Sequence, residues 1–231
     1  MITLMSYNTQ HCRSYLTREI NFDIFADEIK KVGADIIGLN EMRGEGPRED
    51  YTAQTETLAK KLGFNYYFAK AFDVGGENPY GNALLSRYPI CSAVTVAIPN
   101  PESGKFEPRC VLKAIVDTPM GKLLVLVTHF GLSRAEHDNA HKTVLSLIEN
   151  EKCVLMGDFN ITPDNPIISD ISQKMTDTAK YFDTPKLSFP SDFPNIKIDY
   201  MFTSRDIKVC FADIPAHVTS DHRPYVIKIG E

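Results

Sequence analysis

Short, largely apolar runs that each end in an amide, a carboxylate or an imidazole recur along the chain. They are ITLMSY (2–7) before Asn8, DIIGLN (35–40) before Glu41, LLVLVT (123–128) before His129, and VLMG (154–157) before Asp158 and Asn160. Runs of this kind are typical of strands that are covered on both faces. The sequence therefore predicts a sheet-rich core with polar side chains where its strands end.

Strand patterns alternate with a smaller number of helical ones. Strands are predicted over 2–7, 35–40, 65–70, 82–86, 91–98, 110–117, 122–129, 153–157, 197–203, 207–211 and 224–229, and helices over 22–32, 51–62, 134–149 and 166–174. This pattern favours a mixed α/β (α+β) architecture of two packed sheets with the helices outside. No linker or low-complexity segment interrupts the 231 residues, so one domain over 1–231 is expected.

The charge balance bears on the kind of substrate. The formal net charge is −5, and 43% of the residues are hydrophobic and 24% charged, which is ordinary for a globular protein. The longest run of basic residues is the pair Lys60-Lys61. A surface that grips duplex nucleic acid usually shows a basic stripe, so nucleic acid is possible as a partner but not favoured.

Cysteine usage and the start of the chain indicate a compartment. The cysteines are odd in number and widely spaced, at Cys12, Cys91, Cys110, Cys153 and Cys210. This spacing predicts neither a disulfide framework nor a zinc knuckle and fits a reducing compartment. The first strand pattern begins at residue 2 without a signal peptide, and no segment has the length of a membrane span. A cytoplasmic location is therefore expected.

Further polar residues interrupt or precede strands near the C-terminus. Asp199 lies inside the apolar run IKIDYMF, and Asp221-His222 stand just before the last predicted strand. Taken singly, Asp221 could cap a turn, and a histidine such as His129 is more often structural than functional. Asp199 is harder to explain in this way, because a carboxylate in an apolar strand is costly to bury unless it is paired.

Convergence of these strand ends would build one acidic pocket. It would hold the four acids Glu41, Asp158, Asp199 and Asp221 together with Asn8, Asn160, His129 and His222. Clustered carboxylates repel one another unless a cation lies between them or one takes a proton. Oxygen ligands with few imidazoles favour Mg²⁺ or Mn²⁺ over Zn²⁺. Because Mg²⁺ usually keeps water and binds substrate phosphate, the residues indicate hydrolysis of a phosphate ester.

At these positions the sequence resembles the endonuclease/exonuclease/phosphatase superfamily, whose fold is that of DNase I. The matching segments follow the family order and are MSYNTQH (5–11), ADIIGLNE (34–41), YGNALLSRYPI (80–90), EPRCVL (107–112), VTHFGLS (127–133), LMGDFNITPD (155–164), IDYMF (198–202) and SDHRP (220–224). Asn40 departs from the pattern, since glutamine is commoner before the metal glutamate. This replacement of glutamine by asparagine is expected to matter little. The resemblance implies a four-layer α-β-β-α sandwich.

The resemblance also implies a role for each matching residue in metal binding and water activation. Glu41 is the main Mg²⁺ ligand, with Asn8 beside it, Asp221 as a further carboxylate, and Mn²⁺ as a possible substitute ion. Asp158 orients or activates the attacking water. Asp199 pairs with His222 and fixes its tautomer. Whether Asp158 or His222 is the base stays open at this point, with Asp158 preferred.

Four residues are implied to contact the substrate phosphate. Asn160 holds a phosphoryl oxygen, His129 and Asn82 contact the phosphate, and Arg109 lies near that pocket or supports it. A metal and fixed donors would stabilise the charge that develops in the transition state while a base delivers water in line. The expected activity is that of a metal-dependent phosphoric ester hydrolase.

Within that activity, the leading hypothesis is a Mg²⁺-dependent phosphodiesterase that hydrolyses a small or lipid-derived phosphate ester. The alternative is a DNA endonuclease or exonuclease of the same fold, against which the acidic net charge counts. A catalytically inactive binding module is a third hypothesis, but no implied metal or base residue is missing. The natural substrate, the preference between monoesters and diesters, and the oligomeric state are not predicted.

Other conspicuous residues receive structural explanations. The i, i+4 pair His137 and His141 lacks a third ligand for a metal site, and Cys12 is expected to be a small buried hydrophobe. His11 is expected to border the pocket or to be structural, with neither favoured. The segments 73–81 and 184–195 are predicted to be loops at the pocket rim.

Overall fold

The structure is a computed structural model that describes residues 1–148 and 152–230. Its strands are β1 (Ile2–Asn8), β2 (Ile36–Arg43), β3 (Asn65–Val74), β4 (Asn78–Ser86), β5 (Ile90–Ala97), β6 (Cys110–Thr118), β7 (Gly121–His129), β8 (Cys153–Asp158), β9 (Thr176–Asp177), β10 (Asp199–Thr203), β11 (Lys208–Asp213) and β12 (Tyr225–Gly230). Its α-helices are α1 (Phe22–Val32), α2 (Gln54–Leu62), α3 (Arg134–Leu147) and α4 (Pro166–Lys174). Short 3₁₀ helices cover Gln10–Cys12 and Thr178–Tyr181.

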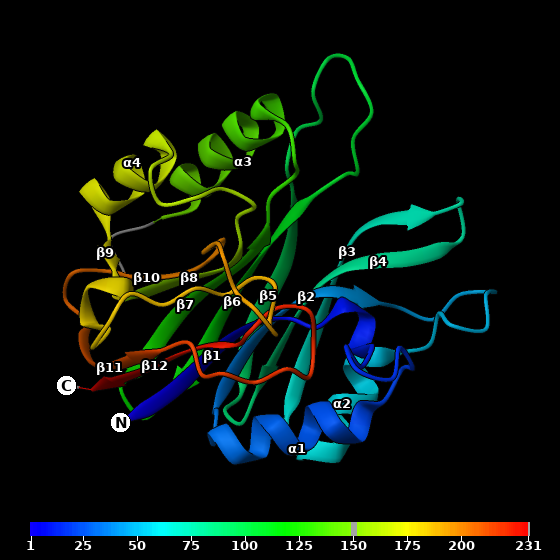
Figure 1. Cartoon of the computed structure of the whole chain (residues 1–231), viewed down its shortest axis with the longest axis horizontal. Helices are drawn as coiled ribbons and strands as arrows, with labels where there is room; N and C mark the ends of the chain where they lie inside the picture. Colours follow the sequence, from blue (N-terminus) through cyan, green and yellow to red (C-terminus); the bar gives the residue numbers. More distant parts are fainter. Residues whose placement is uncertain (149–151, 231) are drawn as a thin grey trace.

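Two six-stranded sheets form the centre of the molecule. Their strand orders are β11-β12-β1-β2-β4-β3 and β5-β6-β7-β8-β10-β9. The sheets pack face to face, with α1 and α2 outside the first and α3 and α4 outside the second (Figure 1). This arrangement confirms the predicted four-layer α-β-β-α sandwich. That the chain forms one domain over 1–231 stays a prediction.

Three apolar layers separate these four layers of secondary structure. Leu4 and Met156 belong to the cluster between the two sheets. Met5 packs in the cluster that α1 and α2 cover, and Leu155 in the cluster beneath α3 and α4. Neighbouring residues of one strand therefore face two different cores, because successive side chains point to opposite faces. This explains why the strand sequences read as continuous apolar runs.

The helix ends follow the capping chemistry of the sequence. The side chain of Asn21 accepts hydrogen bonds at the start of α1, and Gly33 ends that helix with φ of 68°. Ser133 and Glu136 form a reciprocal capping box at the start of α3. Asn165 caps α4, whose first residue is a proline. Helices α1 and α4 have the predicted bounds.

Several elements differ from their predicted bounds. The segment 73–81, predicted to be a loop, instead contains the tip of the β3–β4 hairpin, with a turn at Gly75 and Gly76. Both glycines have positive φ, which a hairpin turn needs. Helix α2 begins three residues after the predicted residue 51, and the short strand β9 was not predicted because two residues carry no pattern. The predicted end of the third helix, residue 149, lies outside the described residues.

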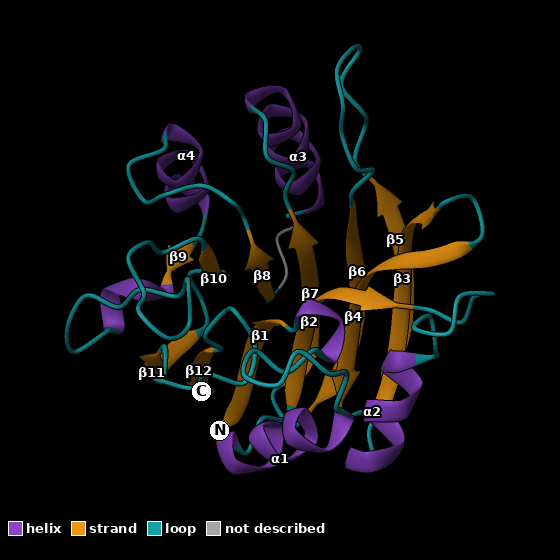
Figure 2. Cartoon of the chain, turned by 45° about the vertical axis from the view of Figure 1, so that its right-hand side comes forward, coloured by secondary structure: helices purple, strands orange, loops and turns teal. Residues whose placement is uncertain are grey.

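Strand register brings the polar strand ends together. The parallel pair β1–β2 sets Asn8 beside Asn40, and the parallel pair β7–β8 sets His129 beside Asp158. Strand β10 runs antiparallel to β8, so its first residue Asp199 also pairs with Asp158. Strands β7 and β8 lie side by side in both views (Figures 1 and 2). The predicted convergence of strand ends is thus a consequence of topology.

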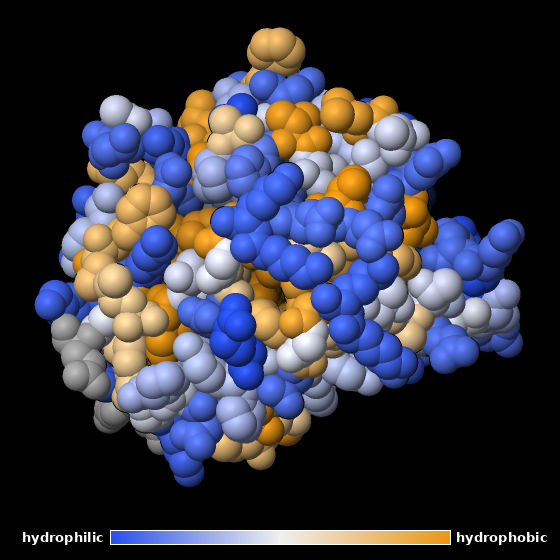
Figure 3. All heavy atoms as spheres, turned by 90° about the horizontal axis from the view of Figure 1, so that it is seen from below, coloured by the Kyte–Doolittle hydropathy of each residue, from blue (hydrophilic) through white to orange (hydrophobic). Residues whose placement is uncertain are grey.

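The surface mixes polar and apolar side chains. Hydrophilic residues cover most of the face in Figure 3, and hydrophobic ones lie between them in small groups. The most exposed large hydrophobic residues after Met1 include Leu16 and Leu132, both 77% exposed, and Phe193, 82% exposed. Among the described residues, no helix combines the length and apolar character needed to cross a membrane.

Candidate active site

Asn8 joins the two sheets at the centre of the site. Its Nδ2 donates to Glu41 Oε1 and to Asp158 Oδ2, each at 3.1 Å. Glu41 extends from the first sheet and Asp158 from the second. Asn8 and Asp158 are almost fully buried, whereas the Glu41 side chain is 24% exposed. The predicted metal ligands and the predicted water-activating acid therefore lie side by side.

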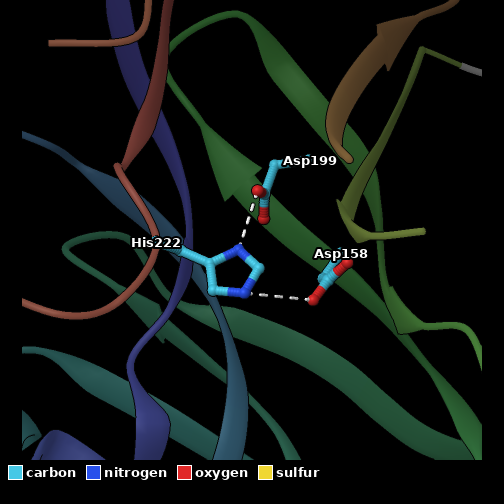
Figure 4. Close-up of side chains that lie close together, drawn as sticks. All are labelled: Asp158, Asp199 and His222. Carbon is cyan, nitrogen blue, oxygen red and sulfur yellow. Dashed lines mark hydrogen bonds and ion pairs between the residues drawn. The ribbon is translucent and has the colours of Figure 1, made fainter. Parts of the chain in front are cut away.

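Asp199, His222 and Asp158 form a buried triad (Figure 4). His222 Nδ1 lies 2.9 Å from Asp199 Oδ2, and Nε2 on the opposite side of the ring lies 3.6 Å from Asp158 Oδ2. Ligand-type atoms of all three residues lie within 4.8 Å of one another. The predicted pairing of Asp199 with His222 is confirmed, and it orients the ring toward Asp158.

Burial and charge shift the protonation of this triad. Burial raises the pKa of Asp158 to about 7, with the charge of His222 opposing the shift and that of Asp199 adding to it. Burial disfavours the cationic form of His222, but Asp199 and Asp158 outweigh it and raise the pKa of His222 to about 10. The charges of Asp199 and Asp158 therefore favour a protonated His222, and burial makes Asp158 a stronger base than an exposed aspartate.

His129 and Asn160 line the same pocket next to Asp158. Arg109 Nη1 donates to His129 Nδ1 at 3.1 Å, and His129 Nε2 lies 3.5 Å from Asp158 Oδ2. Burial lowers the pKa of His129 well below its usual value, and the Arg109 charge lowers it further, so the ring is neutral. Asn160 Nδ2 lies 3.2 Å from His129 Nε2. The cationic Arg109, the neutral His129 ring and the Asn160 amide therefore lie next to one another beside Asp158.

Asp158 and Asn160 are close to each other, but not because they share a strand face. Strand β8 ends at Asp158, and Asn160 has a left-handed backbone with φ of 52°. Its backbone N–H donates to Asp158 Oδ1 at 2.9 Å, which closes a turn. Through this turn, both side chains border the pocket.

Gly157 explains why the segment GDFN needs its glycine. Its φ is 146°, and a Cβ atom there would lie 1.8 Å from the backbone oxygen of Thr128. Strand β8 therefore approaches β7 closely just before Asp158, and only glycine permits this.

Left-handed backbone conformations concentrate at the site. Among residues other than glycine, positive φ occurs at Gln10, His11, Cys12, Glu41 and Asn160, and at Arg18. Such conformations cost free energy in residues with a Cβ atom and are held by surrounding contacts. The left-handed conformation of Glu41 coincides with an irregularity in the β2–β4 register between Leu39 and Met42.

Asn40 is a supporting residue whose importance the sequence did not reveal. Its Nδ2 donates to Asn82 Oδ1 at 2.8 Å and to the Thr128 carbonyl at 2.9 Å. Its Oδ1 accepts from the backbone N–H of Asp158 at 3.0 Å. One buried amide thus connects both sheets and fixes Asp158, and the expectation that asparagine in place of glutamine matters little stays a prediction.

Replacing Asn40 with alanine is expected to lower the free energy of unfolding by about 3 kcal/mol or more. The change leaves buried partners of three hydrogen bonds unsatisfied, at about 1–3 kcal/mol each. Urea unfolding at equilibrium measures the loss. Asn139→Ala is the matched control, because its amide makes one exposed hydrogen bond, to Pro99. A loss for Asn40→Ala no larger than that of the control would contradict the bridging role.

Asn82 lies behind the pocket in this arrangement. It is 3% exposed, and its Nδ2 donates to the Cys110 carbonyl at 3.0 Å while its Oδ1 accepts from Asn40. It is not among the described residues that line the pocket. Contact of Asn82 with phosphate stays a prediction, but the bonds seen here make it a support for Asn40.

The donor set around Glu41 fits a hard divalent cation. Burial raises the pKa of Glu41 and the nearby charge of Asp221 raises it further, against a hydrogen bond from Asn8. Gln10 Nε2 donates to Asp221 Oδ2 at 2.8 Å. The Oε1 atom of Gln10 is buried without a hydrogen-bond partner among the described residues. Two repelling carboxylates beside an unsatisfied amide oxygen are oxygen donors of the kind that Mg²⁺ binds.

A buried network holds the segment that carries Asp221 and His222. Tyr7 Oη donates to Glu28 Oε2 at 3.1 Å and accepts from the backbone N–H of Ser220 at 3.1 Å. His217 Nδ1 lies 2.7 Å from Glu28 Oε1. Tyr7 and Glu28 are buried between the first sheet and α1. No sequence pattern pointed to Glu28, because it is one acid among several on an amphipathic helix.

Replacing Glu28 with alanine is expected to reduce the free energy of unfolding by about 2–3 kcal/mol, because the buried Tyr7 hydroxyl loses its acceptor. Thermal or urea unfolding checks this. Glu56→Ala is the control, since among the described residues Glu56 pairs with Lys60 on the surface in an i, i+4 contact at 2.7 Å, and exposed ion pairs of this kind add little to stability. Equal losses in the two variants would show that the network adds nothing.

The remaining predicted residues have the following places. His11 lines the pocket, and its Nδ1 lies 2.8 Å from the Glu41 carbonyl. Burial raises the pKa of the Cys12 thiol to about 12, which excludes a reactive thiolate near neutral pH. His137 Nε2 donates to the Gly131 carbonyl at 2.8 Å, and His141 Nε2 lies 4.0 Å from Asp170 Oδ2. Neither histidine is among the described residues that line the pocket.

These groups open into one pocket of about 660 Å³. The residues that line it are His11, Glu41, Arg43, Arg48, Tyr51, Phe72, Val74, Tyr80, Glu107, Arg109, His129, Leu132, Asp158, Asn160, Phe189, Ile196, Ile198, Asp221 and His222. The predicted rim segment 184–195 contributes Phe189, whose ring lies 4.8 Å from that of His222. The pocket therefore combines a polar floor with aromatic and aliphatic walls.

Two helix-covered sheets with an acidic site of this kind are typical of phosphoesterases and nucleases of the DNase I-like fold. Comparison with known families identifies which family this chain belongs to. The model of the Endonuclease/Exonuclease/phosphatase family matches residues 5–222. The chain belongs to the endonuclease/exonuclease/phosphatase family.

Individual relatives are distant. The uncharacterised protein YbhP of Escherichia coli (strain K12) is 27% identical over 225 residues, which cover 88% of this chain and 86% of YbhP. An endonuclease/exonuclease/phosphatase from Beutenbergia cavernae matches with a TM-score of 0.83 at 20% identity, over 99% of this chain and 71% of that one. The mannosyl-6-phosphatase Bt3783 of Bacteroides thetaiotaomicron matches with a TM-score of 0.79 at 17% identity, over the whole of both chains. Both structures share the fold.

Proposed function

We propose that this protein is a Mg²⁺-dependent phosphodiesterase that hydrolyses a small or lipid-derived phosphate ester. One observation carries the proposal: Asn8 links the Glu41 carboxylate to Asp158, which itself adjoins the His222–Asp199 pair. An ion-binding group and a water-activating group thus meet in one pocket. Membership of the family supports hydrolysis of a phosphate ester.

Glu41 and Asp221 are the proposed ligands of Mg²⁺, with amide oxygens of Asn8 and Gln10 beside them. A bound Mg²⁺ supplies Lewis-acid stabilisation of charge on a phosphoryl oxygen. The Asn8 Oδ1 atom accepts a hydrogen bond from the Gln10 backbone N–H at 3.2 Å. To offer this oxygen to a metal, the Asn8 amide would have to rotate. Mn²⁺ is expected to substitute because it binds the same oxygen donors.

The triad of Asp158, Asp199 and His222 offers an alternative cation site, because its ligand atoms are close together. We place the ion at Glu41 and Asp221 instead. His222 Nδ1 is already engaged by Asp199 at 2.9 Å, and the raised pKa of His222 means that a proton occupies the ring near neutral pH. A cation at the triad has to displace that proton.

Asp158 is the proposed acceptor of the water proton. Its Oδ1 accepts from the Asn160 backbone and its Oδ2 from Asn8, so the carboxylate is fixed in position. Its pKa of about 7 suits general-base action near neutral pH. His222 keeps its proton and, held by Asp199, donates toward the phosphate. Asp158 is therefore preferred over His222 as the base.

Arg109, His129 and Asn160 are the proposed phosphate contacts. Arg109 has Nη2 on Glu107 at 3.1 Å and Nη1 on His129, which fixes the guanidinium against the pocket wall. Fixed donors stabilise the additional negative charge of the transition state without reorganising during the reaction. Asn160 extends its amide from the turn after β8, beside the attacking side of the phosphate.

The shape of the pocket favours a diester. Strands β3 and β4 pack over β5 and β6, whereas β1 packs over β8 and β10. The pocket is lined by Phe72 and Val74 on the β3–β4 hairpin of the first sheet and by Ile196 and Ile198 before β10 of the second sheet, which we infer to be opposite sides of the polar centre. A phosphate held between two apolar walls has room for a substituent on each side, as a diester requires.

The proposal is tested by hydrolysis of bis(p-nitrophenyl) phosphate and p-nitrophenyl phosphate, each with Mg²⁺ or with EDTA. Higher kcat/KM for the diester, only with Mg²⁺, supports a phosphodiesterase. Faster cleavage of the monoester overturns the diester preference and favours a phosphatase. A duplex DNA substrate tests the nuclease alternative, because cleavage of DNA depends steeply on ionic strength whereas that of a small ester does so much less.

A further inference from the structure

Two arginines of the pocket have no part in the proposed chemistry. Arg43 ends β2, two residues after Glu41, and Arg48 lies in the following loop; both line the pocket together with Tyr51. Neither residue touches the triad or the phosphate contacts described above. They form a separate basic wall beside the proposed metal ligand.

The guanidinium groups of this basic wall are held in place. Arg43 Nη1 bonds Asp50 Oδ2 at 2.6 Å, and Arg48 Nε lies 3.3 Å from Asp50 Oδ1. The guanidinium carbons of Arg43 and Arg48 lie 4.7 Å and 5.1 Å from the centre of the Tyr51 ring. Tyr51 itself is 4% exposed. Stacking and ion pairing together reduce the entropy that each arginine loses on binding a ligand.

The loop that carries Arg48 is tied to its surroundings by its backbone. The Arg48 N–H donates to Asn78 Oδ1 at 3.1 Å, and the Gly44 N–H donates to the Pro79 carbonyl at 2.9 Å. At the end of β2, the Arg43 N–H donates to Gln54 Oε1 at 2.9 Å. The basic wall is thus connected to the β3–β4 hairpin on one side and to α2 on the other.

The basic wall has N–H donors that its own carboxylate does not satisfy. One carboxylate, Asp50, serves two guanidinium groups, and it is not among the described residues that line the pocket. Arg43 Nε is buried without a hydrogen-bond partner in the described part of the chain. Among the described residues that line the pocket, Glu107 is the one further acid outside the metal and base groups, and it pairs with Arg109 at 3.1 Å. A buried N–H donor without a partner calls for an acceptor.

We propose that Arg43 and Arg48 form a second anion subsite, so that the substrate is a phosphate ester with a further anionic group on one substituent. This inference rests on the proposed phosphoesterase function and names a feature of its substrate. Guanidinium groups bind phosphoryl and carboxylate groups alike through paired N–H donors, so either chemistry fits the subsite.

The test compares two diesters that differ in one phosphate: thymidine 5′-(p-nitrophenyl phosphate) with and without a 3′-phosphate. The wild type is expected to show kcat/KM about tenfold higher for the phosphorylated diester, the effect of one charge-assisted hydrogen bond. Arg43→Gln and Arg48→Gln are expected to reduce this ratio toward about one. A ratio near one in the wild type, or an unchanged ratio in both variants, would overturn the proposal.

Arg87→Gln is the matched control. Like Arg48, Arg87 bonds an aspartate, with Nε 2.8 Å from Asp35 Oδ1, and it lies over an aromatic ring, 5.0 Å from the centre of Phe64. The two side chains are also equally exposed, at 54% and 55%. Arg87 is not among the described residues that line the pocket, so its replacement is expected to keep the wild-type ratio.

Ligand binding separates failure of this inference from failure of the proposed function. Competitive inhibition by orthophosphate, pyrophosphate and phosphonoacetate, at fixed free Mg²⁺, shows whether the second group is phosphoryl or carboxylate. If neither thymidine diester is hydrolysed, calorimetry of the same three anions decides. Pyrophosphate or phosphonoacetate binding about tenfold tighter than orthophosphate, and losing this advantage in Arg48→Gln, supports the subsite without any turnover. Equal binding of all three overturns it.

Discussion

Replacement of Asp158 by asparagine is expected to lower kcat for a phosphodiester by about a thousandfold, within the range for a positioned general base. The amide that replaces the carboxylate cannot take a proton from water. Because the two side chains have nearly the same shape, the hydrogen bond that the Asp158 backbone N–H donates to Asn40 is expected to persist. The loss is therefore expected in kcat, with little change in KM, and steady-state kinetics measures both.

Asp170→Asn serves as the control for Asp158→Asn. It is the same substitution on an exposed face of α4, where Asp170 lies 4.0 Å from His141, and activity is expected to stay at the wild-type level. A far-ultraviolet circular dichroism spectrum shows whether Asp158→Asn retains the fold. A folded Asp158→Asn protein with kcat within about tenfold of the wild type would contradict the role of Asp158 as the base, since that role predicts a larger loss.

Removal of divalent ions is expected to abolish activity, and Mg²⁺ or Mn²⁺ is expected to restore it. The charge of Asp221 raises the pKa of Glu41, so that ionised Glu41 is disfavoured unless a cation lies nearby. Glu41→Gln is expected to raise the Mg²⁺ concentration for half-maximal activity by about tenfold or more, because one charged ligand is lost. Titration of activity with Mg²⁺ in both proteins measures this.

Glu107→Gln is the control for the metal experiment, because Glu107 also lines the pocket but pairs with Arg109. It is expected to leave the Mg²⁺ requirement unchanged. Full activity of the wild type in EDTA would contradict the proposed metal dependence. An unchanged Mg²⁺ requirement in Glu41→Gln would move the metal away from Glu41, and the triad of Asp158, Asp199 and His222 would then be the next site to test.

The strand ends of the site could be predicted from the sequence because burial leaves a clear pattern. An apolar run that ends in Asn8, Glu41, His129 or Asp158 marks both a core strand and a polar terminus. Strand pairing then brings these termini together, as the register of β7 with β8 and of β8 with β10 shows. The strand and helix patterns predicted two packed sheets with helices outside, and the family resemblance implied the four-layer α-β-β-α sandwich.

The supporting residues could not be predicted, because their roles depend on partners far away in the sequence. Asn40 reaches Asn82, Thr128 and Asp158, and no local spacing indicates that a single amide spans two sheets. Glu28 likewise lies on an ordinary amphipathic helix, and only the fold places it against Tyr7. Long-range hydrogen bonds of this kind leave no periodic signal.

The outer part of the β3–β4 hairpin was not predicted, for a different reason. The residues DVGGENPYG are rich in glycine and polar side chains, which are typical of a loop. Strands β3 and β4 pair nonetheless as far as Val74 and Asn78, because hydrogen bonding along an established ladder extends it beyond the apolar residues. Local composition therefore predicted strands that are too short.

The most direct test of the proposed chemistry is hydrolysis of bis(p-nitrophenyl) phosphate in ¹⁸O-labelled water with Mg²⁺, followed by mass spectrometry of both products. Attack on phosphorus by a water that Asp158 activates places one ¹⁸O atom in p-nitrophenyl phosphate and none in p-nitrophenol. The Asp158→Asn protein is expected to form labelled product about a thousandfold more slowly. Label in p-nitrophenol, or equal rates of labelling in the two proteins, would contradict this account of the site.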